Sequence, residues 1–180
     1  MHEASGPHRA PEDTRTAIDD KWQAIQWIGN PIDEGAGSNE MAMPDGRGRA
    51  RDFEHGTIYW TPETGAHEIH GDIRIHHARN SWLGYPLTDE TGTPDGIGRF
   101  NHFENGSIYW TADLGAHEVH GAIRDLWASQ GWERGPAGYP TSDEFNDPSA
   151  PGGRQSHFTR GVIAWDPQRG ARFTPGGPID

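Results

Sequence analysis

Histidines are the residues in this chain best suited to bind a metal. His67 and His70 stand three positions apart, and so do His117 and His120. Four imidazoles brought together could bind zinc or copper. On a strand, however, this spacing places the two rings on opposite faces, and the third copy of the pattern has Arg172 in place of its first histidine. We therefore predict no metal site, and expect each histidine to hold its strand to the next helix by a hydrogen bond.

Acidic residues occur in pairs, and each pair follows a proline turn. Two carboxylates at a suitable separation perform acid–base catalysis in glycosidases, but recurrence in three places favours a structural role. An aspartate in a turn accepts backbone N–H bonds and can form a charge-assisted pair with an arginine. We assign no catalytic residue and expect ion pairs between the recurring aspartates and arginines: Asp33, Asp89 and Asp143 with Arg49, Arg99 and Arg154.

Aromatic residues are the remaining candidates. Tyr59-Trp60, Tyr109-Trp110 and Ala164-Trp165 are mid-strand pairs. Because neighbouring strand residues point to opposite faces, one of each pair faces the core. We expect this to be the tryptophan. Trp82 and Trp132 stand just before proline turns and are expected to be exposed. Amphipathic Tyr and Trp suit the C–H faces of sugar rings, so the candidate ligand-binding residues are Trp82, Tyr85, Trp132, Tyr139, Tyr59 and Tyr109, accompanied by Asp89, Asp143, Arg99, His67 and His117.

The elements that must position these residues repeat about every fifty positions. Residues 96–121 closely match residues 46–71, and residues 152–175 form a weaker third copy. Each unit contains a short helix, a Gly-Pro turn, a variable loop and a β-meander. The helices are expected at 17–27, 71–80 and 121–130, and Asn105-Gly106 is a strong hairpin signal in the second meander.

The sequence contains as many predicted helices as predicted meanders, three of each, so the first and last units could meet in a closed ring. The predicted fold class is α+β, mostly β, with three helix–turn–β-meander repeats in a pseudo-threefold, propeller-like ring. An open stack is the alternative, but it requires polar caps at both ends, and the sequence shows none. We expect a disordered leader at 1–16 and one domain at 17–180, with units of about 17–70, 71–120 and 121–180.

Composition narrows the class of protein. The formal net charge is -12, which argues against nucleic acid or an anionic membrane as partner. The absence of cysteine excludes disulfides and thiolate sites. No apolar run reaches the ~20 residues of a membrane span, and Met1 to Arg15 lacks the apolar segment of a signal peptide. These features leave a cytosolic location open.

The second unit carries a long motif. It contains Trp82-Leu-Gly-Tyr-Pro86, the acidic pair, Asp95-Gly-x-Gly-Arg99, Phe103-x-x-Gly-Ser-Ile-Tyr-Trp110 and Gly115-Ala-His-x-Val-His-Gly121. These strings resemble the LGFP repeat, which is named for its Leu-Gly-Phe-Pro turn. The resemblance covers nearly all of 17–180, is strongest in unit two, and departs from the pattern in the turn of unit one.

The resemblance implies a location and a partner. LGFP repeats are appended to exported actinobacterial cell-envelope enzymes and are thought to hold them on the wall, with arabinogalactan as ligand. The expected function is therefore non-catalytic binding of cell-wall polysaccharide, outside the cell or in the wall, without a cofactor and with a separate catalytic domain as a candidate partner. The alternatives are a small enzyme with one asymmetric site, expected among unit-specific residues such as His76-His77, and a protein-interaction module. His76-His77 has no match in the other units and is expected to lie on the surface.

Overall fold

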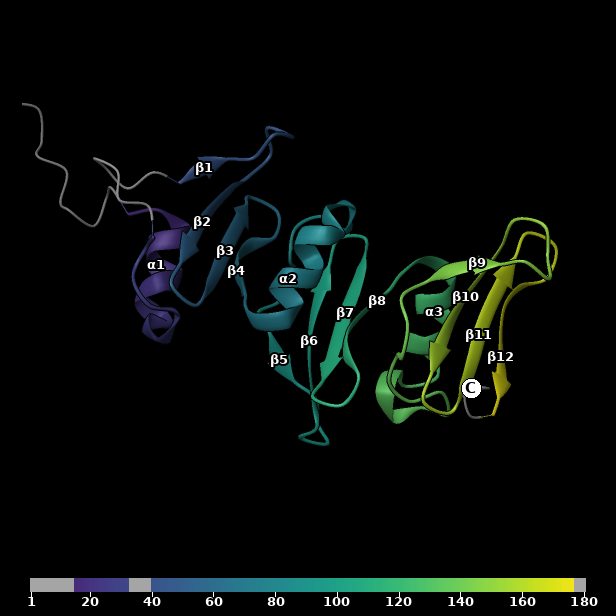
Figure 1. Cartoon of the computed structure of the whole chain (residues 1–180). Helices are drawn as coiled ribbons and strands as arrows, with labels where there is room; N and C mark the ends of the chain where they lie inside the picture. Colours follow the sequence, from purple (N-terminus) through teal and green to yellow (C-terminus); the bar gives the residue numbers. More distant parts are fainter. Residues whose placement is uncertain (1–14, 33–39, 177–180) are drawn as a thin grey trace, which may run out of the picture. The chain divides into compact units, whose positions relative to one another are not determined.

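Each stretch of repeated sequence folds into a short helix followed by a small antiparallel sheet (Figure 1). The computed structural model describes residues 15–32 and 40–176. The expected leader, 1–16, lies outside the described residues except for its last two. Three α-helices and three four-stranded sheets in this part of the chain confirm the α+β, mostly-β class. None of the helices described is long and apolar enough to cross a membrane.

The elements follow the same order in every repeat. The first repeat contains α1 (Ala17–Ala24), the 3-10 turn η2 (Gln26–Ile28), β1 (Met41–Ala42), β2 (Arg49–Phe53), β3 (Gly56–Thr61) and β4 (Gly65–Ile69). The second contains α2 (Gly71–Arg79), η3 (Ser81–Leu83), β5 (Thr91–Gly92), β6 (Gly98–Phe103), β7 (Gly106–Thr111) and β8 (Gly115–Val119). The third contains α3 (Gly121–Ser129), η4 (Trp132–Arg134), β9 (Phe145–Asp147), β10 (Gly153–Phe158), β11 (Gly161–Asp166) and β12 (Gly170–Pro175).

The sheets are meanders in which strands adjacent in sequence are adjacent in space. Their orders are β1-β2-β3-β4, β5-β6-β7-β8 and β12-β11-β10-β9. The predicted meander had three strands. The structure adds a short fourth strand from the end of the loop that was predicted to be variable, and this strand pairs with the first meander strand.

The first helix shows how local sequence sets the element boundaries. Thr16 and Asp19 form a capping box, so each side chain bonds the other residue's backbone N–H at the helix start. Ile18 is the residue that α1 buries in the core. The predicted helix ran to 27, but α1 ends at Ala24 because Ile25 leaves the helical conformation, with φ -130° and ψ 54°. The 3-10 turn η2 follows.

One aromatic ring from each helix bonds the glycine of its proline turn. The ring N–H groups of Trp22 and Trp127 donate to Gly29 O and Gly138 O, at 2.8 and 3.0 Å. His77 takes the same position in the second repeat, with Nε2 2.9 Å from Gly84 O. His77 is buried, so the expectation that it lies on the surface is wrong. These bonds fix the turns on the helices.

The chain forms two compact units, residues 1–67 and 68–180. Within the second unit, α3 lies between the β5–β8 sheet and the β9–β12 sheet (Figure 1). Its inner side chains share one buried cluster with both sheets, formed by Tyr109, Val119, Ile123, Trp127, Ala137, Phe158 and Ile163. The helix of the third repeat therefore provides the core of two repeats at once.

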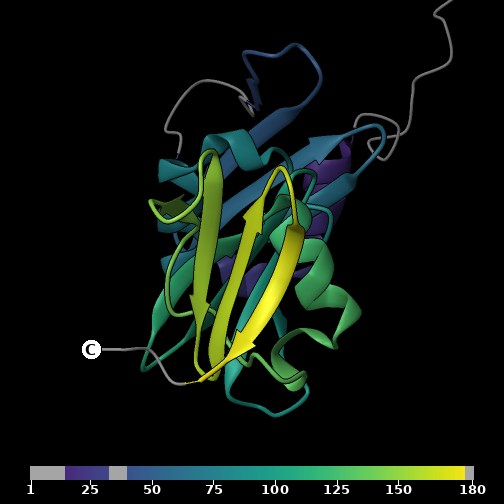
Figure 2. The same ribbon diagram turned by 90° about the vertical axis from the view of Figure 1, so that its right-hand side faces the viewer.

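The other face of the β9–β12 sheet, turned toward the viewer in Figure 2, has no element of 68–176 over it. The strand registers place on this face Gln155, His157, Val162, Ala164, Arg172 and Thr174. The matching face of the β5–β8 sheet, which packs on α3, has Phe100, His102, Ser107, Tyr109, His117 and Val119. Loss of the large apolar rings makes the last face polar, as in terminal repeats of open arrays. This face is therefore more polar than the matching face of the β5–β8 sheet.

We predict that Trp127→Phe lowers the free energy of unfolding by about 1–3 kcal/mol, because it leaves the buried Gly138 carbonyl without its donor. Chemical denaturation followed by circular dichroism measures this. Trp27→Phe is the control: Trp27 is 52% exposed, and its replacement should change the value by less than about 0.5 kcal/mol. Equal effects of the two substitutions would contradict the role given to the Trp127 N–H.

Candidate functional site

The proline turn of each repeat binds to the first hairpin of its own sheet. In the second repeat Leu83 O accepts from Asn105 N and Tyr85 O accepts from Glu104 N, both at 3.0 Å. The Glu104 carboxylate in turn accepts from Tyr85 N at 3.0 Å. Gly84 has φ 80°, and a Cβ there would lie 2.8 Å from the Glu104 side chain, so only glycine fits. This packing buries Leu83 and leaves Trp82, one residue earlier, 46% exposed.

Trp82 borders a groove of about 510 Å³. One wall comes from the turn and hairpin of the second repeat and the other from the start of α3. The lining residues are Trp82, Glu104, Asn105, Gly106, His120, Gly121, Arg124 and Asp125. The indole N–H donates to Asn80 Oδ1 at 3.3 Å, and Asn105 Nδ2 donates to the backbone carbonyl of Trp82 at 2.9 Å. The groove therefore presents an oriented aromatic ring beside charged and amide groups.

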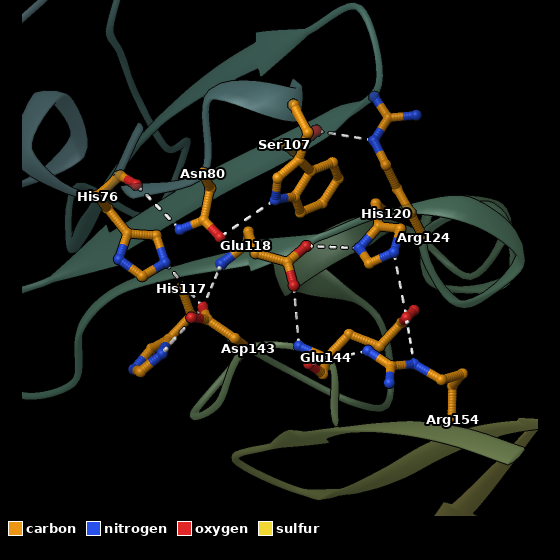
Figure 3. Close-up of polar contacts among 11 residues, drawn as sticks. His76, Asn80, Ser107, His117, Glu118, His120, Arg124, Asp143, Glu144 and Arg154 are labelled. Atoms are coloured by element: carbon orange, nitrogen blue, oxygen red, sulfur yellow. Dashed lines mark hydrogen bonds and ion pairs between the residues drawn. The ribbon is translucent and has the colours of Figure 1, made fainter. Parts of the chain in front are cut away.

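His120 forms the back of the groove and the centre of an ion network, drawn in Figure 3. Its Nδ1 lies 2.7 Å from Glu118 Oε2 and its Nε2 3.1 Å from Glu144 Oε2. Arg154 Nε donates to the same Glu144 oxygen at 2.9 Å. Because Glu118 ends the second repeat and Glu144 belongs to the third, the network joins the two repeats.

Backbone groups complete this joint. Glu144 N donates to Glu118 Oε1 and Glu118 N donates to Asp143 Oδ1, both at 2.9 Å. His76 Nε2 lies 2.8 Å from the same Asp143 oxygen, so His76 contacts the third repeat. The Glu118 side chain is only 3% exposed. It is buried with its charge paired and its oxygens bonded, which is the condition under which a buried carboxylate is tolerated.

The joint before the second repeat has the same chemistry. His70 lies 2.7 Å from both Glu68 Oε2 and Glu90 Oε2, and Arg99 Nε donates to Glu90 at 3.1 Å. Glu68 N donates to Asp89 Oδ1 at 3.2 Å. The two joints are therefore built from equivalent residues.

These contacts shift the pKa of the joint residues. Bonds from Glu118 and Glu144 raise the pKa of His120 to about 9, and bonds from Glu68 and Glu90 raise that of His70 to about 9. Burial acts to raise the pKa of Glu144, but the bonds from His120 and Arg154 outweigh it and the pKa is lowered. Both imidazoles are therefore charged at neutral pH.

The predicted arginine pairs are wrong in one respect. Arg99 and Arg154 bond the glutamate of each acidic pair, Glu90 and Glu144, rather than Asp89 and Asp143. The two aspartates accept backbone N–H bonds, as expected, but from the preceding repeat. Asp33 lies outside the described residues. In the first repeat Arg49 bonds Glu40 at 3.5 Å, so Glu40 takes the place of Glu90.

The predicted aromatic site is only partly brought together. Trp82 is exposed, as expected, whereas Trp132 is half-buried against Trp127 and Tyr109. Tyr85 and Tyr109 are buried. The mid-strand tryptophans expected in the core are all half-buried: Trp60, Trp110 and Trp165. Tyr59 is also half-buried. The expectation that the tryptophan is the core member is wrong for Tyr109-Trp110, where the tyrosine is buried, whereas Trp60 and Trp165 pack against the buried clusters.

Tyr139 connects the third repeat to the second in a different way. Its hydroxyl donates to the Asp95 carboxylate at 2.7 Å and lies 2.8 Å from Thr93 Oγ1. A Cβ added to Gly98 would lie 2.7 Å from the Tyr139 ring. Tyr139 is therefore a contact between repeats and does not line the groove.

The histidines divide into two kinds. His70 and His120 directly precede α2 and α3, and each bonds one carboxylate of its own strand and one of the following repeat, so the expected bond to the next helix is wrong. His67 and His117 instead place Nε2 2.7 Å from carbonyl oxygens of the turns before them, Thr64 O and Leu114 O. Among residues 15–32 and 40–176, no group of three His, Asp or Glu side chains is arranged to hold a metal ion.

Ser107 and His102 resemble a nucleophile and its base. Ser107 Oγ lies 2.6 Å from His102 Nδ1, and Arg124 Nε donates to Ser107 at 2.8 Å. Ser107 is fully buried, however, and the first repeat has Thr57 bonded to Asp52 at 2.7 Å in the same places. Recurrence of a buried hydroxyl–acceptor pair with different residues indicates a structural role.

Sequence reasoning missed several groove and joint residues. Glu68 stands between His67 and His70, and Glu118 stands between His117 and His120. The recurrence of this glutamate was the sequence feature that could have identified it. Asn105 and Arg124 were missed as lining residues, since the approach of the hairpin to the start of α3 is not visible in the sequence.

The chain is a tandem-repeat protein. Each of its three repeats contains a helix, a proline turn that binds a hairpin, and a four-stranded meander, and equivalent ion networks join the repeats. The chain belongs to the LGFP repeat family, whose model matches residues 37–82, 83–135 and 138–180. Each of the first two matches runs through the helix that begins the following repeat. No curated protein matches the chain.

We predict that the free energy of unfolding falls as pH rises from about 6.5 to about 9. His70 and His120 have a pKa of about 9 in the folded protein, against an ordinary value of 6.5 for histidine, so the folded state binds more protons in this window. Below 6.5 their contribution is fully present. The lowered pKa of Glu144 acts only in acid, where its contribution is lost.

Urea unfolding at pH 6, 7, 8 and 9 tests this. The double variant His70→Gln/His120→Gln should be less stable at pH 6 and should show a flatter profile. A wild-type stability that is constant or rises over this range would contradict the assignment of charged imidazoles to the joints.

Proposed function

We propose that this protein is a non-catalytic module that binds cell-wall polysaccharide of the arabinogalactan type, and that the Trp82 groove is a binding site. The observation that carries the proposal is an exposed, oriented indole on a groove of about 510 Å³ with hydrogen-bonding groups around it. An exposed tryptophan fixed by hydrogen bonds costs little to order on binding. Its face suits the C–H surface of a sugar ring.

The rim of the groove supports a neutral ligand. Glu104 and Asp125 carry negative charge, and Arg124 and His120 carry positive charge. Opposite charges in balance offer donors and acceptors to sugar hydroxyls without attracting a polyanion. The formal net charge of -12 further opposes acidic ligands.

The repeats are not equivalent as binding units. Trp27 stands before the turn of the first repeat as Trp82 does in the second, and it is 52% exposed. The third repeat has Pro136 before its turn, and its additional Trp132 packs inward. We infer two tryptophan-bearing turns rather than three, whose weak single-site affinities would add by avidity on one polymer.

The location follows from the ligand. A protein that binds wall polysaccharide acts in the wall or outside the cell, and a catalytic domain held there by this module is the partner that the proposal implies.

The arrangement of the three repeats is part of the same proposal. One helix and one sheet per repeat support a propeller-like ring, whereas the polar outer face of the β9–β12 sheet supports an open stack. Small-angle scattering separates the two. A radius of gyration near about 16 Å, typical of a compact chain of this length, supports the ring, and a clearly larger value supports the stack.

We predict that Trp82→Ala weakens retention on arabinogalactan-bearing walls by about tenfold, the effect of losing one buried aromatic anchor. Co-sedimentation with delipidated walls, compared with peptidoglycan stripped of arabinogalactan, measures it. Phe145→Ala is the matched control, because it removes a different exposed ring and should leave binding unchanged. No retention of the wild type on either material would overturn the proposed function.

Salt provides a second check. Retention should be nearly the same at about 50 mM and about 500 mM NaCl, because a neutral sugar gains little from charge attraction that salt would screen. A steep loss with salt would indicate a charged ligand and contradict the neutral-sugar assignment.

A further inference from the structure

Trp82 and His120 touch although they lie 38 positions apart. Their ring centroids are 4.6 Å apart and the ring planes meet at 69°, an edge-to-face contact. Trp82 belongs to the turn of the second repeat, and His120 is the residue that leads into α3. The groove therefore has one wall in each of two repeats, and this ring contact lies where the walls meet.

His120 is held by the joint rather than by the groove. Both of its ring nitrogens bond carboxylates, one from each repeat. It therefore has no ring nitrogen left for a ligand, and its influence on the groove passes through its contact with Trp82.

Charged groups approach His120 from each neighbouring element. Glu118 comes from β8, Glu144 precedes β9, and Arg154 comes from β10, where it bonds the same Glu144 oxygen as His120. Arg124 and Asp125 from α3 and Glu104 from the hairpin line the groove together with it. The two carboxylates in direct contact keep the imidazole charged.

We propose that the groove is a composite site for a neutral saccharide, which is complete only while the second and third repeats are joined. His120 is the positioning residue of this site, because its ring contact fixes the orientation of the Trp82 indole. This inference rests on the proposed function, since it names how that site is assembled. A cationic imidazole beside the indole attracts it. Loss of the charge removes this attraction and one of the ties between the repeats, so ligand binding and the joint are linked.

A ligand-free measurement tests the positioning role. Protonated imidazole quenches indole fluorescence more than neutral imidazole, so the Trp82 emission should increase as pH rises, with a midpoint near 9. The signal is obtained as the difference between the wild type and Trp82→Phe. His120→Gln should abolish the step. Glu144→Gln, which removes one carboxylate and keeps the imidazole, should move the midpoint to lower pH.

A binding measurement tests the link to the ligand, with soluble arabinogalactan as the probe. Affinity of the wild type should fall roughly three- to tenfold between pH 7 and pH 10, the factor expected for one aromatic contact. His120→Gln should bind at pH 7 as the wild type does at pH 10 and should change little with pH. Circular dichroism at each pH confirms that the variants remain folded.

The outcomes separate the two proposals. Binding at pH 7 that does not weaken at pH 10, or a fluorescence step that persists in His120→Gln, overturns the role of His120 and leaves the proposed function standing. Absence of binding at every pH overturns both. A midpoint that does not move in Glu144→Gln shows that the step does not come from His120 and likewise overturns the inference.

Discussion

A buried glutamate at the end of each inner sheet is the constraint on which the repeat array depends. Glu118 is 3% exposed and carries its charge into the contact between two repeats. A carboxylate in that position is strongly unfavourable unless every oxygen is bonded. The structure meets this requirement with His120 and the backbone N–H of Glu144, and Glu68 is treated in the same way by His70 and the N–H of Glu90. Since half of these partners come from the next repeat, the glutamate is satisfied only when repeats are joined in one register.

The array uses apolar packing for a different purpose. α3 supplies Ile123 and Trp127 to a core shared by two sheets, which provides most of the buried area but is not directional. Directional contacts set how the second and third repeats are oriented on each other. They are the ion network, the Tyr139–Asp95 contact and the bond from His76 to Asp143. At the last sheet both features disappear together. Phe173 and Pro175 occupy the places of Glu118 and His120, and the outer face loses its large rings. The third repeat therefore differs from the second both in its charge pattern and in the side chains on the outer face of its sheet.

Much of this fold could be predicted from the sequence, because the repeat itself aligns the helices, turns and hairpins. The limits came from contacts between repeats. Arg99 was assigned to Asp89 because the two recur together, but the register of the short strand β5, which pairs Gly92 with Arg99, brings Glu90 to the guanidinium. His77 was placed on the surface because no other histidine matches it, yet it replaces the tryptophan that bonds the turn glycine in the other repeats. Alignment of the repeats by position would have identified the role of His77, whereas a search for matching histidines did not. Trp82 was correctly expected to be exposed because it directly precedes a buried turn residue.

The groove arises from these same rules. A proline turn that must bury Leu83 turns the preceding residue outward, and the joint brings His120 against it. The Ser107–His102 pair does not line the groove, and its Thr57–Asp52 counterpart in the first repeat indicates a structural role. The groove offers an indole that bonds Asn80 and contacts the His120 ring, with charges of both signs at its edge. Because its two walls belong to different repeats, the contacts that join the second and third repeats are also the ones that bring His120 against Trp82.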